Sequence, residues 1–239
     1  MIKIQNLNLK LDDTVIFKNA NIEIPENKIT MIVGPNGTGK TTLLKVITKE
    51  IKTDCKLENT FKKVFYLPQK LYYPKGISTF DYLSSVFFKN TWKWFLDRED
   101  KKRILKVLDK IELSNRRDVK IENLSAGEIQ KANIGLGLLS DADILLLDEP
   151  TSNMDLINQI KTLDIIKKLT ESNITSVIIM HDLNLSSSYG DYFIGISPQN
   201  KIIQATQKEF FTAETLNEIY NISFKVVNNE EKFFVQIFN

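Results

Sequence analysis

The sequence contains almost no cysteine, and it has no stretch that could cross a membrane as a helix. Its single cysteine, Cys55, rules out a disulfide bond within the chain, which fits a reducing compartment. Its apolar runs, such as residues 144–147, fall far short of the roughly 18 residues that a membrane-spanning helix requires. The first residues lack the charged and apolar regions of a secretory signal, so we expect a cytoplasmic protein.

An excess of one charge is also absent, because 32 lysines and arginines oppose 30 aspartates and glutamates. The net charge of +2 provides no general attraction to nucleic acid or anionic lipid, and we expect no nucleic-acid partner. With 42% hydrophobic residues, the composition is typical of a globular protein rather than a disordered one. The length of 239 residues corresponds to one large domain, or to a core with one subdomain.

The periodicity of the chain predicts an α/β fold with a mostly parallel sheet. Residues 2–24 alternate apolar and polar side chains, which is typical of strands with one buried face. Short apolar strands then alternate with helical segments, and this order favours parallel strands joined by right-handed crossovers. The predicted strands are 28–33, 63–67, 143–147, 175–180 and 191–196, and the predicted helices are 40–50, 125–139, 156–169 and one from about 183.

A helical insert interrupts this pattern. Between residues 78 and 113 glycine disappears and the apolar spacing approaches about 3.6 residues, most regularly over 97–111. The tail predicts a short helix over 213–220 and a closing pair of strands, 223–227 and 232–238. We therefore expect a single domain, 1–239, with a core formed by 1–69 and 123–239 and a helical subdomain formed by 70–122.

Residues 34–41 match the pattern G-x-x-x-x-G-K-[ST] in full, between a buried strand and a helix. Glycine permits the backbone conformations that turn successive N–H groups toward an anion, and the following helix adds its positive end. In this pattern Lys40 contacts the β- and γ-phosphates, and the Thr41 hydroxyl ligates Mg²⁺. The predicted nucleotide-binding residues are Gly34, Pro35, Asn36, Gly37, Thr38, Gly39, Lys40, Thr41 and Thr42.

A second element narrows the class of nucleotide-binding protein. The apolar strand 144–147 is followed by Asp148 and Glu149. At the carboxyl end of a strand, Asp148 can hold Mg²⁺ through water, and Glu149 can polarise a water that attacks the γ-phosphate. A kinase would need an acceptor site there, and a GTPase would need a guanine-binding motif of the Asn-Lys-x-Asp kind, which the sequence lacks.

Residues 124–128, Leu-Ser-Ala-Gly-Glu, resemble the signature of one family, the ATP-binding subunits of ABC transporters. Residues 66–69 look like that family's Q-loop, 152–155 like its D-loop and 180–182 like its switch-histidine segment. The resemblance covers 34–182 and implies a P-loop NTPase core with an N-terminal antiparallel β subdomain and an inserted α-helical subdomain. It also implies that the protein is an ATPase that binds ATP and Mg²⁺.

The resemblance implies roles for individual residues. His181, the only histidine in the chain, would donate a hydrogen bond to the γ-phosphate. In the family, Ser125 and Gly127 meet the γ-phosphate held by the opposite subunit. The implied catalytic residues are Glu149, His181 and Gln69, the implied metal contacts are Thr41, Gln69 and Asp148, and the further nucleotide contacts are Ser125, Gly127, Glu128 and Asp155.

Two positions depart from the family pattern. Ala126 replaces the first glycine of the signature, and its small side chain is tolerated unless the position needs a positive φ. Leu11 stands where many family members stack an aromatic ring on adenine, so it offers apolar contact without a π face. We include Leu11 among the expected nucleotide contacts, and we expect Phe17 to pack in the core.

Residues 180–185, 211–220 and 155–159 look like the subfamily that imports iron-siderophores, haem and cobalamin. This resemblance implies a head-to-tail dimer of two ATP-binding subunits, transmembrane permease subunits and, indirectly, a solute-binding protein. The subunit would then lie at the cytoplasmic face of the cell membrane as a peripheral protein.

The permease is expected to dock between residue 70 and about residue 95. Gln69 would act as a hinge, and the groove would include some of Tyr72, Tyr73, Phe80, Trp92 and Trp94. The aromatic run 87–95 has two interpretations, a docking face for the permease or the small core of the helical insert itself.

Two other functions compete with this importer. The first is an ABC ATPase of another transporter subfamily, or one that works without a membrane partner. Tandem cassettes, a long coiled-coil insert or a basic surface would favour the latter, and the sequence has none of them. The second is an inactive nucleotide-binding scaffold, which the presence of Lys40, Glu149 and His181 opposes.

Overall fold

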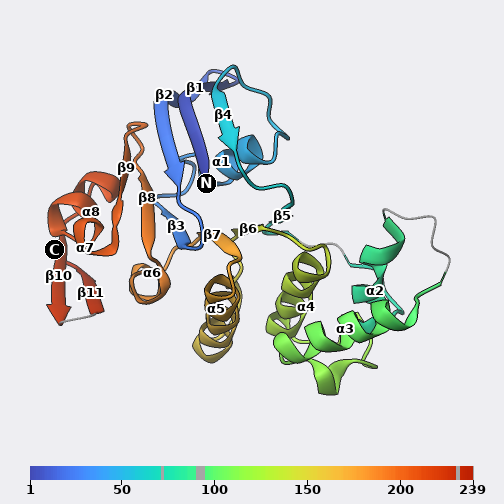
Figure 1. Cartoon of the computed structure of the whole chain (residues 1–239). Helices are drawn as coiled ribbons and strands as arrows, with labels where there is room; N and C mark the ends of the chain where they lie inside the picture. Colours follow the sequence, from blue (N-terminus) through green and yellow to red (C-terminus); the bar gives the residue numbers. More distant parts are fainter. Residues whose placement is uncertain (71–72, 90–94, 230–231, 239) are drawn as a thin grey trace.

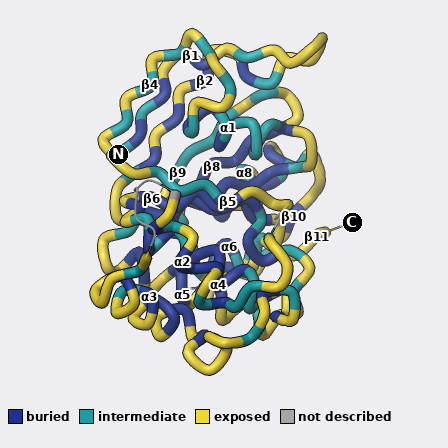
Figure 2. Tube along the Cα trace, turned by 90° about the vertical axis from the view of Figure 1, so that its right-hand side faces the viewer, coloured by how far each residue is buried: buried dark blue, intermediate teal, exposed yellow. Residues whose placement is uncertain are grey.

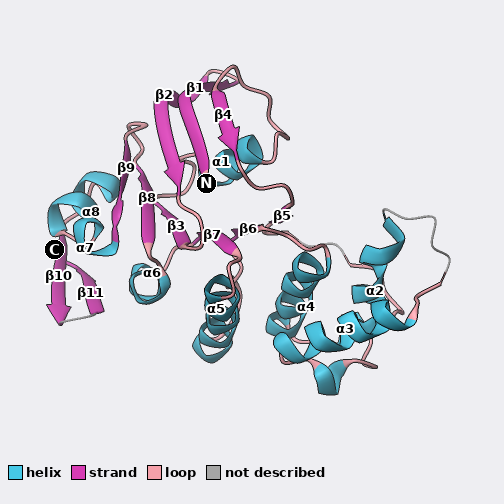
Figure 3. Ribbon diagram, viewed as in Figure 1, coloured by secondary structure: helices cyan, strands magenta, loops and turns pink. Residues whose placement is uncertain are grey.

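The computed structural model describes residues 1–70, 73–89, 95–229 and 232–238. A small sheet stands above a larger central sheet, helices cover the opposite face of the central sheet, and two helices form a lobe at one side (Figures 1 and 3). Figure 2 shows that the buried residues follow the central strands and the inner faces of the helices. This arrangement confirms the predicted α/β class.

The central sheet has six strands in the order β5-β6-β7-β3-β8-β9. All neighbouring strands are parallel except β8 and β9, which pair antiparallel. The strands β3, β6 and β7 are buried along their whole length, as expected for parallel strands covered on both faces. The strands are β3 (Ile29–Val33), β5 (Val64–Leu67), β6 (Ile144–Asp148), β7 (Thr175–Ile179), β8 (Tyr192–Ile196) and β9 (Ile202–Thr206).

The N-terminal sheet is antiparallel and has the strand order β2-β1-β4. Its apolar face packs with α1 against one face of the central sheet, so that α1 lies between the two sheets. This is the predicted antiparallel subdomain, but β4 was not predicted. The elements are β1 (Ile2–Leu11), β2 (Thr14–Ile24), β4 (Lys56–Asn59) and α1 (Lys40–Ile47).

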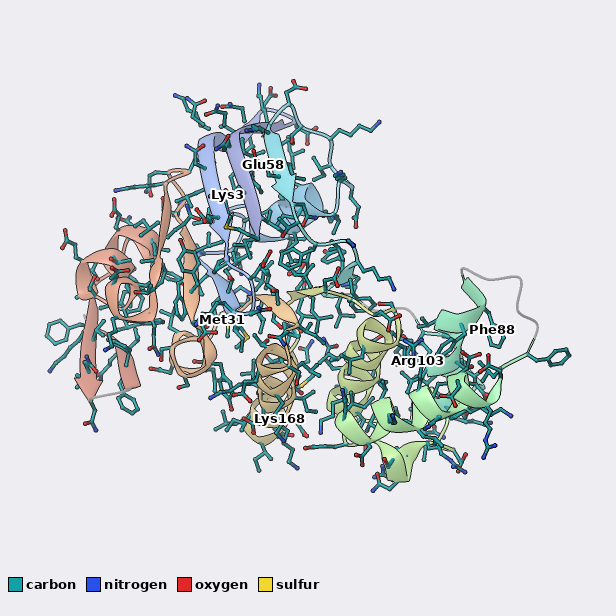
Figure 4. All side chains as sticks on the ribbon, viewed as in Figure 1. Lys3, Met31, Glu58, Phe88, Arg103 and Lys168 are labelled. Carbon is teal, nitrogen blue, oxygen red and sulfur yellow. The ribbon has the colours of Figure 1, made fainter. Side chains whose placement is uncertain are left out.

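Five of the described helices cover the other face of the central sheet. The core there surrounds Met31, which lies at the middle of the molecule in Figure 4, and it includes the aromatic cluster of Phe193, Phe210 and Phe211. The helices are α4 (Ala126–Leu139), α5 (Leu156–Glu171), α6 (Leu183–Tyr189), α7 (Gln207–Phe210) and α8 (Ala213–Tyr220).

The side lobe consists of α2 (Thr79–Lys89) and α3 (Arg98–Lys110), and it has a core of its own that includes residues of α4. Asp97 caps α3 with a capping box, which confirms the predicted start of this helix. Arg103 joins the lobe to the end of α4, because its Nη2 donates to the Leu139 carbonyl at 3.1 Å and to Asp141 at 2.5 Å (Figure 4).

In the described part of the aromatic run 87–95, one side chain belongs to the core of the helical insert, and others are exposed, as a docking face would require. Phe87 is buried in the lobe's core, and Phe88 and Phe95 are exposed. Tyr73 and Phe80 pack against the same core. Tyr72, Trp92 and Trp94 lie outside the described residues.

The chain ends in the predicted antiparallel pair, β10 (Phe224–Asn229) and β11 (Lys232–Ile237). The Asn184 side chain on α6 binds both backbone groups of Val235, accepting from its N–H at 2.8 Å and donating to its carbonyl at 3.3 Å. An amide side chain thus occupies the edge of β11 as a neighbouring strand would. The hairpin is thereby tied to the helical face of the core.

Candidate functional site

The parallel strands bring four predicted segments to one edge of the central sheet. The phosphate loop follows β3, and Gln69 follows β5. Asp148 is the last residue of β6 and Glu149 comes next, and His181 follows β7. Because β5, β6, β7 and β3 are neighbours that run in one direction, their carboxyl ends lie side by side. Ligands of open α/β sheets bind at this edge.

The phosphate loop depends on glycine at both of its ends. Gly34 has φ 144° and Gly39 has φ 97°, both in the region that favours glycine. A Cβ on Gly34 would lie 2.2 Å from the backbone oxygen of Ile196, and one on Gly39 would lie 2.5 Å from Ile16. The loop therefore follows the neighbouring backbone closely and enters α1 at Lys40.

Lys40 is buried, and its amino group is bound to the loop itself. Its Nζ donates to the carbonyl oxygens of Gly34 and Pro35, each at 2.8 Å. Burial lowers the pKa of Lys40, and the carboxylates of Glu149 and Asp148 oppose this effect. The loop thus holds a cation where the pattern places the β- and γ-phosphates of a nucleotide.

Asp148 carries an unpaired oxygen in the interior. Its side chain is 3% exposed, its Oδ2 accepts from the Tyr66 hydroxyl at 3.5 Å, and no described residue forms a hydrogen bond to its Oδ1. Burial raises the pKa of Asp148, an effect that the hydroxyls of Thr41 and Tyr66 oppose and that the charge of Glu149 increases. A buried acceptor without a donor is costly unless a ligand supplies the partner.

This donor set fits Mg²⁺. Asp148 and Thr41 offer oxygen atoms, which are the ligands that Mg²⁺ prefers. Among the described residues no group of three or more histidine, cysteine or acidic side chains forms a metal cage. Mg²⁺ usually keeps several waters and is shared between one or two protein ligands and the phosphates of a nucleotide.

Glu149 is the point on which the predicted catalytic residues converge. Gln69 Nε2 donates to Glu149 Oε2 at 2.6 Å, and His181 Nε2 donates to Glu149 Oε1 at 2.6 Å. The backbone of Glu149 has φ 51°, a conformation that costs a non-glycine residue energy and that clusters at functional sites. Both carboxylate oxygens are therefore fixed at the edge of the sheet.

The signature segment begins α4. Ser125 caps the helix and forms a capping box with Glu128, and Arg116 Nε donates to Glu128 Oε1 at 2.8 Å. Ala126 is the first helical residue and is not among the residues with positive φ, so the alanine is accommodated. Position 126 therefore does not need the positive φ that would have made glycine necessary there.

The predicted nucleotide contacts fall into two groups within the chain. A Cβ on Gly127 would lie 3.4 Å from Asn158, whose side chain and backbone donate to Asp155, so the signature and the D-loop segment are adjacent. Between the described residues, no hydrogen bond connects Ser125, Gly127 or Glu128 to the phosphate loop.

Leu11 and Phe17 lie on paired strands of the N-terminal sheet. Leu11 is 39% exposed at the end of β1, opposite Thr14. Phe17 is buried, and its ring would lie 3.2 Å from a Cβ on Gly39, so it packs in the core as predicted. The contact of Leu11 with a nucleotide base stays a prediction.

Sequence reasoning missed the partners of two predicted residues. Tyr66 is hydrogen-bonded to Asp148, and Arg116 is paired with Glu128. Tyr66 was named only as part of the Q-loop, and its contact depends on the register of β5 against β6. No local pattern in the sequence encodes that register.

The fold and the site define an ATP-binding cassette, a domain that binds and hydrolyses ATP. A family model described as ABC transporter matches residues 17–152, which is more than half of the chain. The chain therefore belongs to the ABC transporter family.

Individual relatives resemble the chain over nearly its whole length. Petrobactin import ATP-binding protein YclP of Bacillus subtilis (strain 168) is 28% identical over 240 residues, covering 95% of each protein. Iron(3+)-hydroxamate import ATP-binding protein FhuC of the same organism is 28% identical over 240 residues, covering 94% of this chain and 89% of the relative. A solved structure of a metal-chelate type ABC transporter, inward-facing, has TM-score 0.87 at 23% identity over 99% of this chain and 96% of that one, and so shares the fold.

No helix in the described part of the chain is both long enough and apolar enough to span a membrane.

The close approach at Gly34 gives a test of the phosphate loop. Gly34→Ala would place a methyl group against the fixed Ile196 carbonyl, so we expect a loss of about 1–3 kcal/mol in the free energy of unfolding and at least about tenfold weaker ATP binding. Gly37→Ala is the matched control, because Gly37 has φ 80° but no atom within 4 Å of the added Cβ. Chemical unfolding and calorimetric ATP titration measure both variants. Equal effects at the two positions would contradict the account.

Proposed function

We propose that the chain is the ATP-hydrolysing subunit of a membrane importer for iron chelates. The observation that carries the hydrolytic part is the convergence of Gln69 and His181 on Glu149 beside the phosphate loop. The chemical class of the cargo rests on relatives named for petrobactin and iron(3+)-hydroxamate import, which match over more than nine-tenths of this chain.

The residues divide the chemistry of hydrolysis among them. Lys40 and the loop N–H groups bind the phosphates, and Lys40 exchanges its contacts with Gly34 and Pro35 for phosphate oxygens. Glu149 orients the attacking water and accepts its proton. His181 Nε2 exchanges its contact with Glu149 for an oxygen of the γ-phosphate. Gln69 positions the same water.

Mg²⁺ belongs to this site as the counterion of the nucleotide. Asp148 and Thr41 would hold it, with Gln69 as a further contact. When bound, it would neutralise phosphate charge that develops during the reaction.

Removing the negative charge of Glu149 tests its role. Glu149→Gln keeps the size of the side chain but cannot accept a proton, so we expect ATP binding to persist and turnover to fall by about 10²-fold or more. Steady-state phosphate release and ATP affinity report the two effects. Glu58→Gln, on the N-terminal sheet and away from the site (Figure 4), is the control and should hydrolyse ATP like the unchanged protein. Normal turnover in Glu149→Gln would remove Glu149 from the reaction.

The division of the nucleotide contacts into two groups supports a head-to-tail dimer. The phosphate loop, Glu149 and His181 form one group, and Ser125, Gly127 and Asp155 form the other. Next to Asp155, Leu156 and Ile157 are 59% and 65% exposed. A two-fold dimer would bring the first group of one subunit against the second group of its partner and would cover these side chains.

Covalently linked pairs test whether the sites are shared. When one subunit carries Lys40→Ala and the other carries Ser125→Arg, one shared site contains both changes and the other contains neither, so about half of the activity should survive. When both changes lie in the same subunit, each shared site contains one of them, and activity should be lost. ATP hydrolysis by the two pairs gives the answer. The reverse pattern would show that each subunit hydrolyses ATP with its own signature.

The side lobe is the proposed docking surface for the permease. Phe95 is 86% exposed and Phe88 is also exposed, and the first helix of the lobe, α2, begins ten residues after Gln69. A movement of Gln69 when the nucleotide binds or is hydrolysed would thus be transmitted to the lobe. This arrangement would hold the subunit at the cytoplasmic face of the membrane, where a solute-binding protein acts on it only through the permease.

Uptake of an iron chelate tests the proposed cargo class. In cells that lack the gene, we expect accumulation of radioiron from hydroxamate or catecholate chelates to fall at least about tenfold, and the unchanged gene should restore it. A gene carrying Glu149→Gln should fail to restore uptake, and one carrying Glu58→Gln should succeed. If uptake of every chelate is unaffected by the deletion while ATP hydrolysis by the purified protein is normal, the cassette serves another cargo.

A further inference from the structure

The register of β5 against β6 places the hydroxyl of Tyr66 against Asp148. Tyr66 on β5 is the partner of Leu146 on β6, and Asp148 follows Leu146 by two residues. Residues two apart in a strand share a face, so Tyr66 and Asp148 lie on the same face of adjacent strands. Two residues of a strand span about 6.6 Å, a distance that a tyrosine side chain covers and a shorter side chain does not. Tyr66 OH accordingly lies 3.5 Å from Asp148 Oδ2.

Packing fixes the ring that carries this hydroxyl. Tyr66 is partly buried against the apolar cluster that includes Leu44 of α1 and Leu146 of β6. The ring is therefore held by the central sheet and by the helix that begins at the phosphate loop. The place of the hydroxyl is determined by the same elements that determine the place of Lys40.

The bond to Tyr66 distinguishes the two oxygens of Asp148. Oδ2 accepts from the Tyr66 hydroxyl, whereas Oδ1 is buried and receives no hydrogen bond from the part of the chain that the structure describes. Without the Tyr66 hydroxyl, Oδ2 would lose this donor and Thr41 would be the remaining hydroxyl that interacts with the carboxylate. The carboxylate would then be freer to turn about its last torsion, which has a broad energy minimum. Gln69 and His181 cannot replace the hydroxyl, because both bind Glu149.

We propose that Tyr66 is a positioning residue that orients Asp148, so that Oδ1 presents its free lone pairs to the divalent cation of the bound nucleotide. The inference rests on the proposed function, since it requires that the site bind ATP together with a cation. Tyr66 itself does not touch the reacting atoms. Its loss should weaken the metal-dependent part of nucleotide binding and leave the rest unchanged.

Binding measured with and without a metal ion separates these two parts. Mn²⁺ replaces Mg²⁺ as a probe that electron paramagnetic resonance detects, and ATP affinity is measured with Mn²⁺ and again in a chelator. In Tyr66→Phe, which keeps the ring and its packing, we expect about three- to tenfold weaker binding of Mn²⁺–ATP and unchanged binding of metal-free ATP. In hydrolysis, the Mg²⁺ concentration for half-maximal rate should rise by the same factor.

Tyr189→Phe is the matched control. The Tyr189 hydroxyl also donates to an aspartate, Asp164 Oδ1 at 2.8 Å, but Tyr189 is the last residue of α6 and Asp164 lies on α5. This variant removes a tyrosine–aspartate bond of the same kind and should bind Mn²⁺–ATP like the unchanged protein.

Each outcome decides the question. If Tyr66→Phe binds Mn²⁺–ATP normally, or loses affinity for metal-free ATP equally, Tyr66 does not position Asp148 for the metal. If Tyr189→Phe produces the same loss, the effect is a general change of stability and the inference is wrong. If the unchanged protein binds ATP no better with Mn²⁺ than without it, the metal site of the proposed function fails, and the inference fails with it.

Discussion

The common direction of β5, β6, β7 and β3 is the constraint on which this site depends. Each of these strands delivers one functional segment at its carboxyl end, so residues 32 and 80 positions apart in the chain form hydrogen bonds to the same carboxylate. A parallel sheet needs crossover connections. Here α1 with the N-terminal sheet covers one face, helices cover the other, and both exclude water from the strands. Burial of the strands in turn fixes their register, and register fixes which side chains meet at the edge.

The same edge contains groups that the free protein holds at a cost. Lys40 is buried and donates its hydrogen bonds to carbonyl oxygens, Asp148 Oδ1 receives no hydrogen bond from the described residues, and Glu149 adopts a left-handed backbone conformation. The backbone conformation alone costs on the order of 1–3 kcal/mol, and an unsatisfied buried acceptor costs about as much. The surrounding sheet and helix stabilise these groups, and a bound nucleotide with its cation would supply the missing partners.

The sequence predicted those parts of the fold and the site that depend on local patterns. The phosphate loop, the acids after β6, the cap at Asp97 and the helix that starts after Ser125 follow from residues within one short segment each. The strands β4 and β9 were not predicted, because they are short and half-exposed and their extended form depends on pairing, with β1 far along the chain for β4 and with the preceding strand β8 for β9. The hydrogen bonds of Tyr66 to Asp148 and of Arg116 to Glu128 were not predicted either, because each depends on how separate segments of the chain meet. The resemblance to a family identified which residues act together, and the strand register showed how they meet.

The central claim is that Glu149, held by Gln69 and His181, faces the water that attacks the γ-phosphate. A structure of the protein trapped with ADP, Mg²⁺ and vanadate tests this most directly, because the apical vanadate oxygen marks the position of that water. The account predicts a Glu149 oxygen within hydrogen-bond distance of the apical oxygen, with His181 on an equatorial one and Ser125 of a second copy on the same vanadate. A Glu149 side chain turned away from the apical oxygen, with another group in its place, would contradict it.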